Sequence, residues 1–295
     1  MKLFFIFSSS LLFLFTTQSL AQGLYVTLEG GASMASSKQE TTYSFPSDNP
    51  WKYRLFNKGT NGKTNLGFGL GVNYGGTIGF MLNQNIGIQL GVSSFSGRDN
   101  KNIILPSYSD EEPELLYTTS MMRFIPSILL ITGNGSLKPY AKIGVIFGIT
   151  EIIEKRDYSM QGFAPISSLY PYNSQIYNVK STKEFSGGLA IGYHAELGIQ
   201  YSINNKISLI GGLNMISLIY SPEKSSYTKF NIGRKDELAS LTTTEKETEY
   251  VEEYSGQNLY PYPSPPINNE EPRKELERSF DFGSIGLTTG IMFNF

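Results

Sequence analysis

The chain has 295 residues with 24 basic and 26 acidic side chains, so its formal net charge is only −2. A nearly neutral chain gives no sign of nucleic-acid binding, and we expect no such partner. The sequence contains no cysteine, which excludes a disulfide framework, thiol catalysis and a lipid-modified N-terminal cysteine.

The N-terminal segment has the pattern of a secretory signal peptide. An apolar run at residues 3–15 follows Lys2, and the small residues of the SLA motif at 19–21 supply a cleavage site. The apolar run is shorter than the roughly 20 residues that a bilayer-spanning helix needs. We therefore expect residues 1–21 to be a removed signal peptide and residues 22–295 to form one exported domain.

Apolar residues alternate with small or polar residues in eight stretches of the mature chain. Leu66, Phe68 and Leu70, for example, alternate with glycines. Successive side chains of a strand point to opposite faces, so the pattern predicts strands with one apolar face. The expected strands cover residues 23–34, 65–82, 86–97, 118–131, 137–152, 185–202, 207–220 and 281–295.

The connections between these strands are short and long in turn. The short turns at 83–85, 133–136 and 204–205 are rich in Asn and Gly, which tolerate positive φ. This layout is typical of an all-β, up-and-down antiparallel transmembrane barrel with short periplasmic turns and long extracellular loops. The expected outer loops lie near residues 35–64, 98–117, 153–184 and 221–280.

The few charged side chains within the expected strands take the phase opposite to the apolar face. A Lys or Arg turned to lipid at mid-membrane would cost about 2–4 kcal/mol, so this phase is predicted to face the lumen. We expect Lys142 to pair with at least one carboxylate at similar depth, and His194 to be satisfied among Glu196, Arg123 and Gln200. The predicted lumen cluster is Glu29, Arg123, Lys142, His194 and Glu196.

Two features depart from a regular eight-stranded barrel. Pro126 lies inside an expected strand and removes a ladder hydrogen bond, so we expect a bulge there. The segment 221–280 also has room for a hairpin around Phe230 and Tyr250, which would give ten strands as an alternative.

Several segments resemble successive hairpins of the bacterial outer-membrane β-barrel family of the outer-membrane protein A and protein X type. They include YVTLEGGASMA, LKPYAKIGVIFG, SGGLAIGYHAELGIQYSINNKISLIGGLNM and the final GLTTGIMFNF. The resemblance covers the strands and not the loops. It implies a location in the bacterial cell outer membrane. We expect a barrel domain only, without the peptidoglycan-binding domain of the anchor subtype.

The final residues also resemble the signal by which the outer-membrane assembly machinery takes up barrel proteins. The matching positions are Thr288, Gly290, Phe293 and Phe295, in the order polar, Gly, aromatic, aromatic. This resemblance makes the barrel assembly machinery an expected partner during biogenesis.

Enzymatic activity is not expected. Barrel proteases and acyl-modifying barrels need a histidine near the outer rim, because general base catalysis near neutral pH favours imidazole. The only histidine, His194, falls in the middle of a strand. A lone histidine among dispersed carboxylates also lacks the spacing of metal ligands, so we expect no catalytic residue, metal or cofactor.

An eight-stranded barrel is just wide enough for side chains to fill its interior, so we expect a plugged scaffold. The alternative is a small-solute, porin-like channel, in which the lumen ion pairs would exchange partners. A soluble carrier barrel, with apolar side chains inward, is a further alternative.

The outer loops carry the most unusual sequence. Leu169-Tyr170-Pro171-Tyr172 recurs as Leu259-Tyr260-Pro261-Tyr262. Proline favours extended, preorganised segments and tyrosine supplies contact area, which favours a protein or glycan contact site. The same tyrosines are also consistent with packing on the barrel rim and lipid headgroups. Expected partners are outer-membrane lipids, lipopolysaccharide and an extracellular protein or glycan, with Tyr170, Tyr172, Tyr260 and Tyr262 as candidate contacts.

Overall fold

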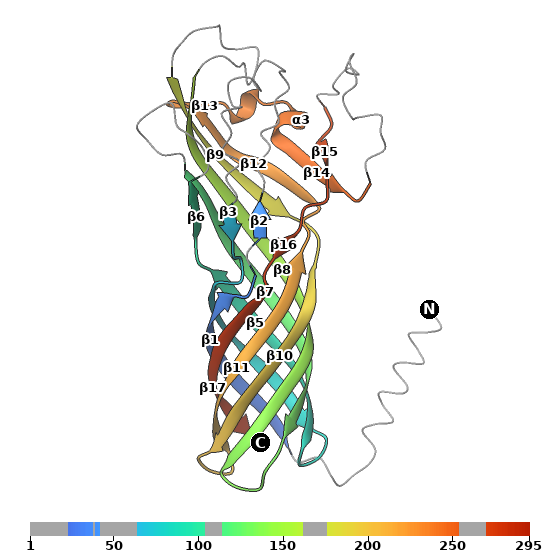
Figure 1. Ribbon diagram of the computed structural model, residues 1–295. Helices are drawn as coiled ribbons and strands as arrows, with labels where there is room; N and C mark the ends of the chain where they lie inside the picture. Colours follow the sequence, from blue (N-terminus) through green and yellow to red (C-terminus); the bar gives the residue numbers. More distant parts are fainter. Residues whose placement is uncertain (1–22, 38, 42–63, 104–113, 162–175, 254–269) are drawn as a thin grey trace, which may run out of the picture.

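The computed structural model describes residues 23–37, 39–41, 64–103, 114–161, 176–253 and 270–295. Within these residues, eight antiparallel strands close into a barrel (Figure 1). β17 pairs with both β1 and β11, so the barrel sheet has no open edge. The barrel strands are β1 (Leu24–Ala35), β4 (Gly71–Met81), β5 (Ile86–Gly97), β7 (Glu114–Ile131), β8 (Leu137–Gln161), β10 (Ala190–Ser202), β11 (Ile207–Tyr220) and β17 (Ser284–Asn294).

The eight-stranded barrel predicted from the alternation is confirmed, but several strand limits were wrong. β7 begins four residues before the expected strand 118–131, and β8 continues nine residues beyond the expected end at 152. The expected strand 185–202 is two elements separated by Gly187 and Gly188, whose φ angles are +76° and +72°. Glycine adopts this left-handed region without a Cβ clash, so the chain turns sharply there.

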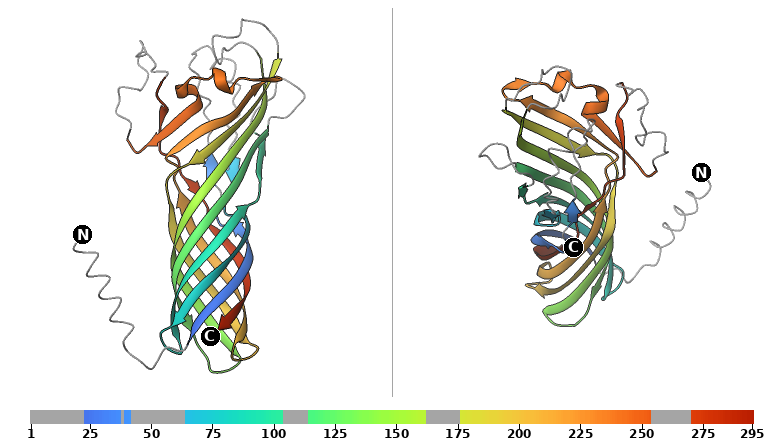
Figure 2. Two further views of the ribbon diagram at one scale, coloured as in Figure 1. Left: turned by 180° about the vertical axis from the view of Figure 1, so that it is seen from behind. Right: turned by 45° about the horizontal axis from the view of Figure 1, so that its top comes forward.

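The upper half of β8 carries a second sheet above the barrel. β8 has 25 residues and is therefore about 80 Å long at about 3.3 Å per residue, whereas a membrane-spanning strand needs only about 9–11. Figures 1 and 2 show the additional strands rising from one side of the barrel. This outer sheet has the order β6 (Asn100–Ile103), β7, β8, β9 (Ile176–Ser186), β12 (Lys224–Ile232), β14 (Glu247–Val251) and β15 (Arg273–Leu276).

The expected loop 221–280 therefore contains regular structure. β12 and β14 form the antiparallel pair anticipated around Phe230 and Tyr250. They extend the outer sheet from β9 and do not enter the barrel wall, so the ten-stranded alternative is wrong. The elements β13 (Lys235–Asp236), η1 (Leu238–Ser240) and α3 (Thr243–Lys246) connect β12 to β14.

Three short strands lie near the outer end of the barrel. β2 (Gln39–Thr41) and β3 (Thr64–Leu66) form a separate two-stranded sheet. The expected strand 65–82 therefore started too early, because its barrel part begins only at Gly71. β16 (Phe280–Asp281) pairs with the end of β11 and brings the chain back to the barrel before β17.

The expected bulge at Pro126 is absent from the pairing of β7 with β8. Pairing is interrupted between Phe124 and Ser127, but the register is the same on both sides of the gap. A Cβ at Gly144 would lie 2.5 Å from the carbonyl oxygen of Pro126. Because residue 144 is a glycine, the two backbones can approach closely here. The missing ladder hydrogen bond at Pro126 is therefore accommodated without an inserted residue.

The outer surface of the barrel is apolar. Ile143, Leu197 and Leu287 expose 64%, 68% and 65% of their surface, and each alternates with inward-facing residues. Such a broad apolar surface is unfavourable in water and matches the hydrocarbon of a bilayer.

No helix among the described residues has both the length and the apolar character needed to cross a membrane.

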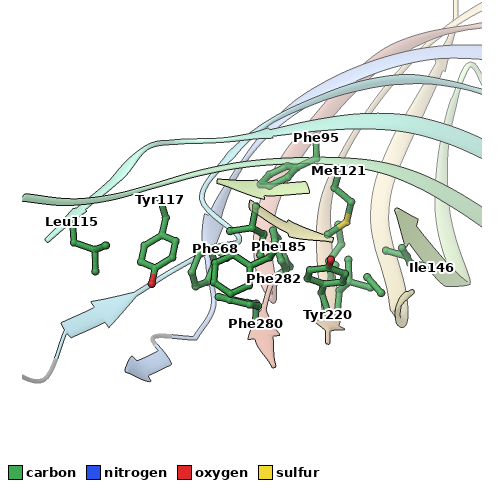
Figure 3. Packing of buried hydrophobic residues seen from close by; sticks show 14 residues of the cluster. Phe68, Phe95, Leu115, Tyr117, Met121, Ile146, Phe185, Tyr220, Phe280 and Phe282 are labelled. Carbon is green, nitrogen blue, oxygen red and sulfur yellow. The ribbon is translucent and has the colours of Figure 1, made fainter. Parts of the chain in front are cut away.

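The barrel interior has apolar layers at both ends. The lower layer, near the short turns, consists of Tyr25, Leu129, Tyr140, Ile210 and Met292. The upper layer is larger and lies at the outer end. Figure 3 shows how its side chains pack, among them Phe95, Tyr220 and Phe282. Phe280 packs edge-on against Phe68 and Phe185, with ring centres 5.2 and 5.3 Å apart. The polar lumen therefore lies between two apolar layers.

Candidate functional site

Lys142 lies between two carboxylates in the lumen. β8 and β10 bring it directly opposite Glu196 in the sheet register, and its Nζ is 3.2 Å from Glu196 Oε1. The same Nζ reaches across the lumen to Glu29 Oε2 on β1 at 3.1 Å. The structure thus places the three residues together as the phase and depth of their strands predicted.

Further hydrogen bonds hold both carboxylates in place. The Tyr140 hydroxyl donates to Glu196 Oε1 at 2.5 Å, and the Thr77 hydroxyl donates to Glu29 Oε1 at 3.2 Å. Lys142 and Glu196 are each 3% exposed. A buried charge is tolerated only when it is paired and hydrogen-bonded, and this arrangement meets that condition.

Arg123 departs from the expected pairing. Its side chain is 1% exposed, and its Nη2 has no hydrogen-bond partner. The guanidinium carbon lies 4.2 Å from the centre of the Phe95 ring, and Nε contacts the sulfur of Met121 at 3.4 Å. No carboxylate of the described chain lies within ion-pair distance. The strand phase was predicted correctly, but barrel shear sets which residues meet across the lumen.

His194 lies beside the lysine-carboxylate group. Its Nε2 is 3.7 Å from Glu196 Oε2, and its Nδ1 has no partner. Gln200 does not contact it, because the Gln200 amide donates to Ser208 Oγ at 3.0 Å. The expected contacts with Arg123 and Gln200 are therefore wrong. A cavity of about 40 Å³, enough for one or two waters, is lined by both His194 and Arg123.

A second group of charges, which the sequence did not indicate, lies on the outer sheet. One row crosses four strands in register, from Tyr117 on β7 through Glu154 and Lys183 to Tyr227 on β12. These positions continue the lumen-facing phase above the barrel, so this inner face is turned toward the barrel axis. In the outer-sheet strands β9 and β12, polar residues occupy both faces. Such a sequence pattern resembles that of a loop.

Glu154 is the buried centre of this row. Tyr117 Oη donates to its Oε2 at 2.5 Å, and Arg156 Nε donates to its Oε1 at 2.6 Å. Arg278 in turn donates to the Tyr117 hydroxyl at 3.1 Å. Burial alone would raise the pKa of Glu154, but the two guanidinium groups and the tyrosine hydrogen bond outweigh burial and hold this pKa below its ordinary value.

The amine of Lys183 has fewer stabilising contacts than that of Lys142 in the lumen. Its Nζ is 3.4 Å from Thr248 Oγ1 and lies 5.4 Å from the centre of the Tyr227 ring. Burial lowers the pKa of Lys183, and the attraction of Glu275 and Glu154 does not compensate for it. Burial likewise raises the pKa of Tyr250 to about 12.

The remaining predicted site residues fall into two groups. Tyr170, Tyr172, Tyr260 and Tyr262 lie outside the described residues, as does the signal peptide. Thr288, Gly290 and Phe293 are on β17, and Phe295 follows it with 78% of its surface exposed.

No family model matches this sequence, and no curated protein matches it. Its fold is similar to Neisserial surface protein A, at 10% identity and a TM-score of 0.36 over 94% of this chain and 100% of that one. It is also similar to a major outer membrane protein from Thermus thermophilus, at 10% identity and a TM-score of 0.29 over 92% and 99% of the two chains. Both TM-scores are low, and neither similarity indicates a function for this chain.

Proposed function

We propose that this protein is a non-enzymatic outer-membrane barrel whose plugged body carries an outer sheet for specific contacts at the cell surface. The observation that carries the proposal is the division of the molecule along β8. Its lower half belongs to a barrel with an apolar exterior and apolar layers at both ends of the lumen. Its upper half belongs to a sheet that is longer than membrane crossing requires.

The contents of the lumen support a plug. Lys142, Glu29 and Glu196 pair across the barrel, which ties three strands together. A conducting path would need these ion pairs to separate and both apolar layers to open. A small-solute channel is the competing function. Measurement of planar-bilayer conductance distinguishes it from the plugged scaffold.

The chemistry of the lumen also supports a non-enzymatic function. The single histidine, His194, is 8% exposed and lies below the upper apolar layer. A general base that is buried in this position is poorly placed to reach an external substrate.

The outer-membrane location implies assembly from the periplasmic side. The Thr288, Gly290, Phe293 and Phe295 pattern lies at the end of the strand that closes the barrel against β1. Changing Phe293 and Phe295 together to Ala is expected to lower the amount of folded protein in the outer membrane several-fold. The same change at Leu213 and Leu287 tests for general loss of lipid-facing apolar area, and an equal reduction there would argue against a specific signal.

Planar-bilayer conductance of the refolded full chain tests the plug. We expect no unit conductance from the unaltered protein. A variant with Phe68, Phe280 and Phe282 all changed to Ala opens the upper layer and serves as the sensitised comparison. Reproducible unit steps from the unaltered protein, removed by Lys142→Met or altered in ion selectivity by it, would favour the channel.

A further inference from the structure

The inner face of the outer sheet carries more positive than negative charge. Four charged groups act on Lys183, namely the carboxylates Glu154 and Glu275 and the guanidinium groups Arg156 and Arg278. Arg156 is paired with Glu154, and Glu275 lies 3.7 Å from Arg273. The charges of Lys183 and Arg278 are therefore left over.

Neither of the two cations contacts Glu154 directly, although Arg278 is close enough to lower the pKa of this carboxyl. Both of its oxygens already accept short hydrogen bonds, from Tyr117 and Arg156. Within the described chain, neither Lys183 nor Arg278 has a carboxylate at ion-pair distance. Half-buried cations are stabilised by a counter-charge, and here the protein supplies none in contact.

Aromatic rings surround the two cations. Lys183 Nζ lies 5.7 Å and Arg278 Cζ lies 5.3 Å from the centre of the same Phe185 ring. Tyr250 stacks on Phe185 with an interplanar angle of 17°, and its hydroxyl is 3.0 Å from Ser225 Oγ. Phe185 itself is fully buried and belongs to the upper apolar layer, so it lies beneath this group. We call the half-buried residues above it the cation-aromatic face, which comprises Arg156, Lys183, Tyr227, Tyr250 and Arg278.

We infer that the cation-aromatic face binds an anionic oligosaccharide. Cations pair with carboxylate, sulfate or phosphate groups, hydroxyls bond sugar hydroxyls, and aromatic rings cover the apolar face of a pyranose. The inference rests on the proposed surface function and names its ligand class.

The position of the face argues against the alternatives. It continues the lumen-facing phase of β8, so it is turned away from the surrounding bilayer and its lipid headgroups. A free inorganic anion would use the two cations and the tyrosine hydroxyls but would gain nothing from the faces of the aromatic rings. The aromatic surroundings therefore favour a sugar that carries the charge.

The test uses the refolded full chain and a fluorescent sulfated hexasaccharide, with a neutral glucose hexasaccharide as the uncharged probe. Binding is measured by fluorescence anisotropy. We expect Lys183→Gln or Arg278→Gln to weaken binding of the sulfated probe about tenfold, since each removes a charge-assisted contact. Tyr227→Ala should also weaken it, and the neutral probe should not bind.

Lys224→Gln is the matched control, because Lys224 is exposed and occupies the opposite phase of the same outer sheet. It should bind the sulfated probe as the unaltered protein does. Slower migration after boiling in SDS identifies variants that have folded, and Lys183→Arg, which keeps the charge, should retain most of the binding.

The inference would be overturned if folded protein showed no saturable binding of the sulfated probe, or if Lys224→Gln lost as much binding as Lys183→Gln. Unchanged binding in Tyr227→Ala, with full competition by inorganic phosphate at the probe's concentration, would overturn it too. Tighter binding of an acidic hexapeptide than of the sugar would also overturn it. None of these results bears on conductance, so the plugged-scaffold proposal is tested separately.

Discussion

The barrel lumen and the inner face of the outer sheet both carry buried charges, but they neutralise them differently. In the barrel, Lys142 contacts carboxylates from two other strands, and all these groups lie in an interior closed at both ends. In the outer sheet, Lys183 and Arg278 are half-buried and lack such partners. Lys142 in the closed lumen obtains its counter-charge from the protein, whereas Lys183 and Arg278 on the outer face can obtain theirs from a ligand.

Removing the lumen cation is expected to have the largest effect on stability. Lys142→Met leaves the buried Glu196 and the half-buried Glu29 without their shared cation and should lower the free energy of unfolding by about 3–5 kcal/mol. Adding Glu196→Gln should recover part of this loss. Urea unfolding of the single and double variants measures the coupling, and simple additivity would mean that the contact between the two residues is energetically unimportant.

A substitution in the upper apolar layer should have the next largest effect on stability. Phe280 is fully buried, so Phe280→Ala should lower the free energy of unfolding by about 3 kcal/mol through lost contacts and a cavity. Leu287→Ala, on the lipid-facing surface, is the comparison and should cost less, because lipid fills the vacated space. A larger loss from Leu287→Ala in the same urea unfolding assay would contradict the assignment of these two faces.

Arg123 provides the sharpest contrast with Lys142. It is as deeply buried but has no carboxylate partner, so Arg123→Met should change the free energy of unfolding by no more than about 1 kcal/mol. The loss of its contact with Phe95 is offset by removal of an unsatisfied donor. A loss matching that of Lys142→Met would show that Arg123 has a strong counter-charge in the folded protein.

The smallest expected effect is a pH dependence of sugar binding. Burial lowers the pKa of Lys183 below the ordinary 10.5, and the ligand prefers the protonated amine. Binding should therefore be complete below this lowered pKa and weaken several-fold as the pH rises through it. Lys183→Arg should remove that step, which fluorescence anisotropy across an alkaline pH series would detect. The charged groups that act on Lys183 are Glu154, Arg156, Glu275 and Arg278. The nearby titratable groups are Tyr227, whose ring lies 5.4 Å from Lys183 Nζ, and Tyr250, which stacks on the neighbouring Phe185.

Strand alternation was sufficient to predict the barrel and the lumen position of Lys142, because a closed wall imposes one phase on every strand. It did not predict β9 or β12, since polar residues such as Ser181 and Lys183 occupy their inner face and make the segments resemble loops. The isolation of Arg123 was also unpredictable, because neighbours across the lumen depend on the stagger between strands.

The central claim is that the outer sheet lies outside the cell while the short turns face the periplasm. The sequence has no cysteine, so single substitutions can be labelled cleanly with a membrane-impermeant maleimide. Lys224→Cys, in the outer sheet, should be labelled on intact cells, whereas Gln84→Cys, in a short turn, should be labelled only after the outer membrane is permeabilised. Labelling of Gln84→Cys on intact cells, with Lys224→Cys protected, would contradict the account.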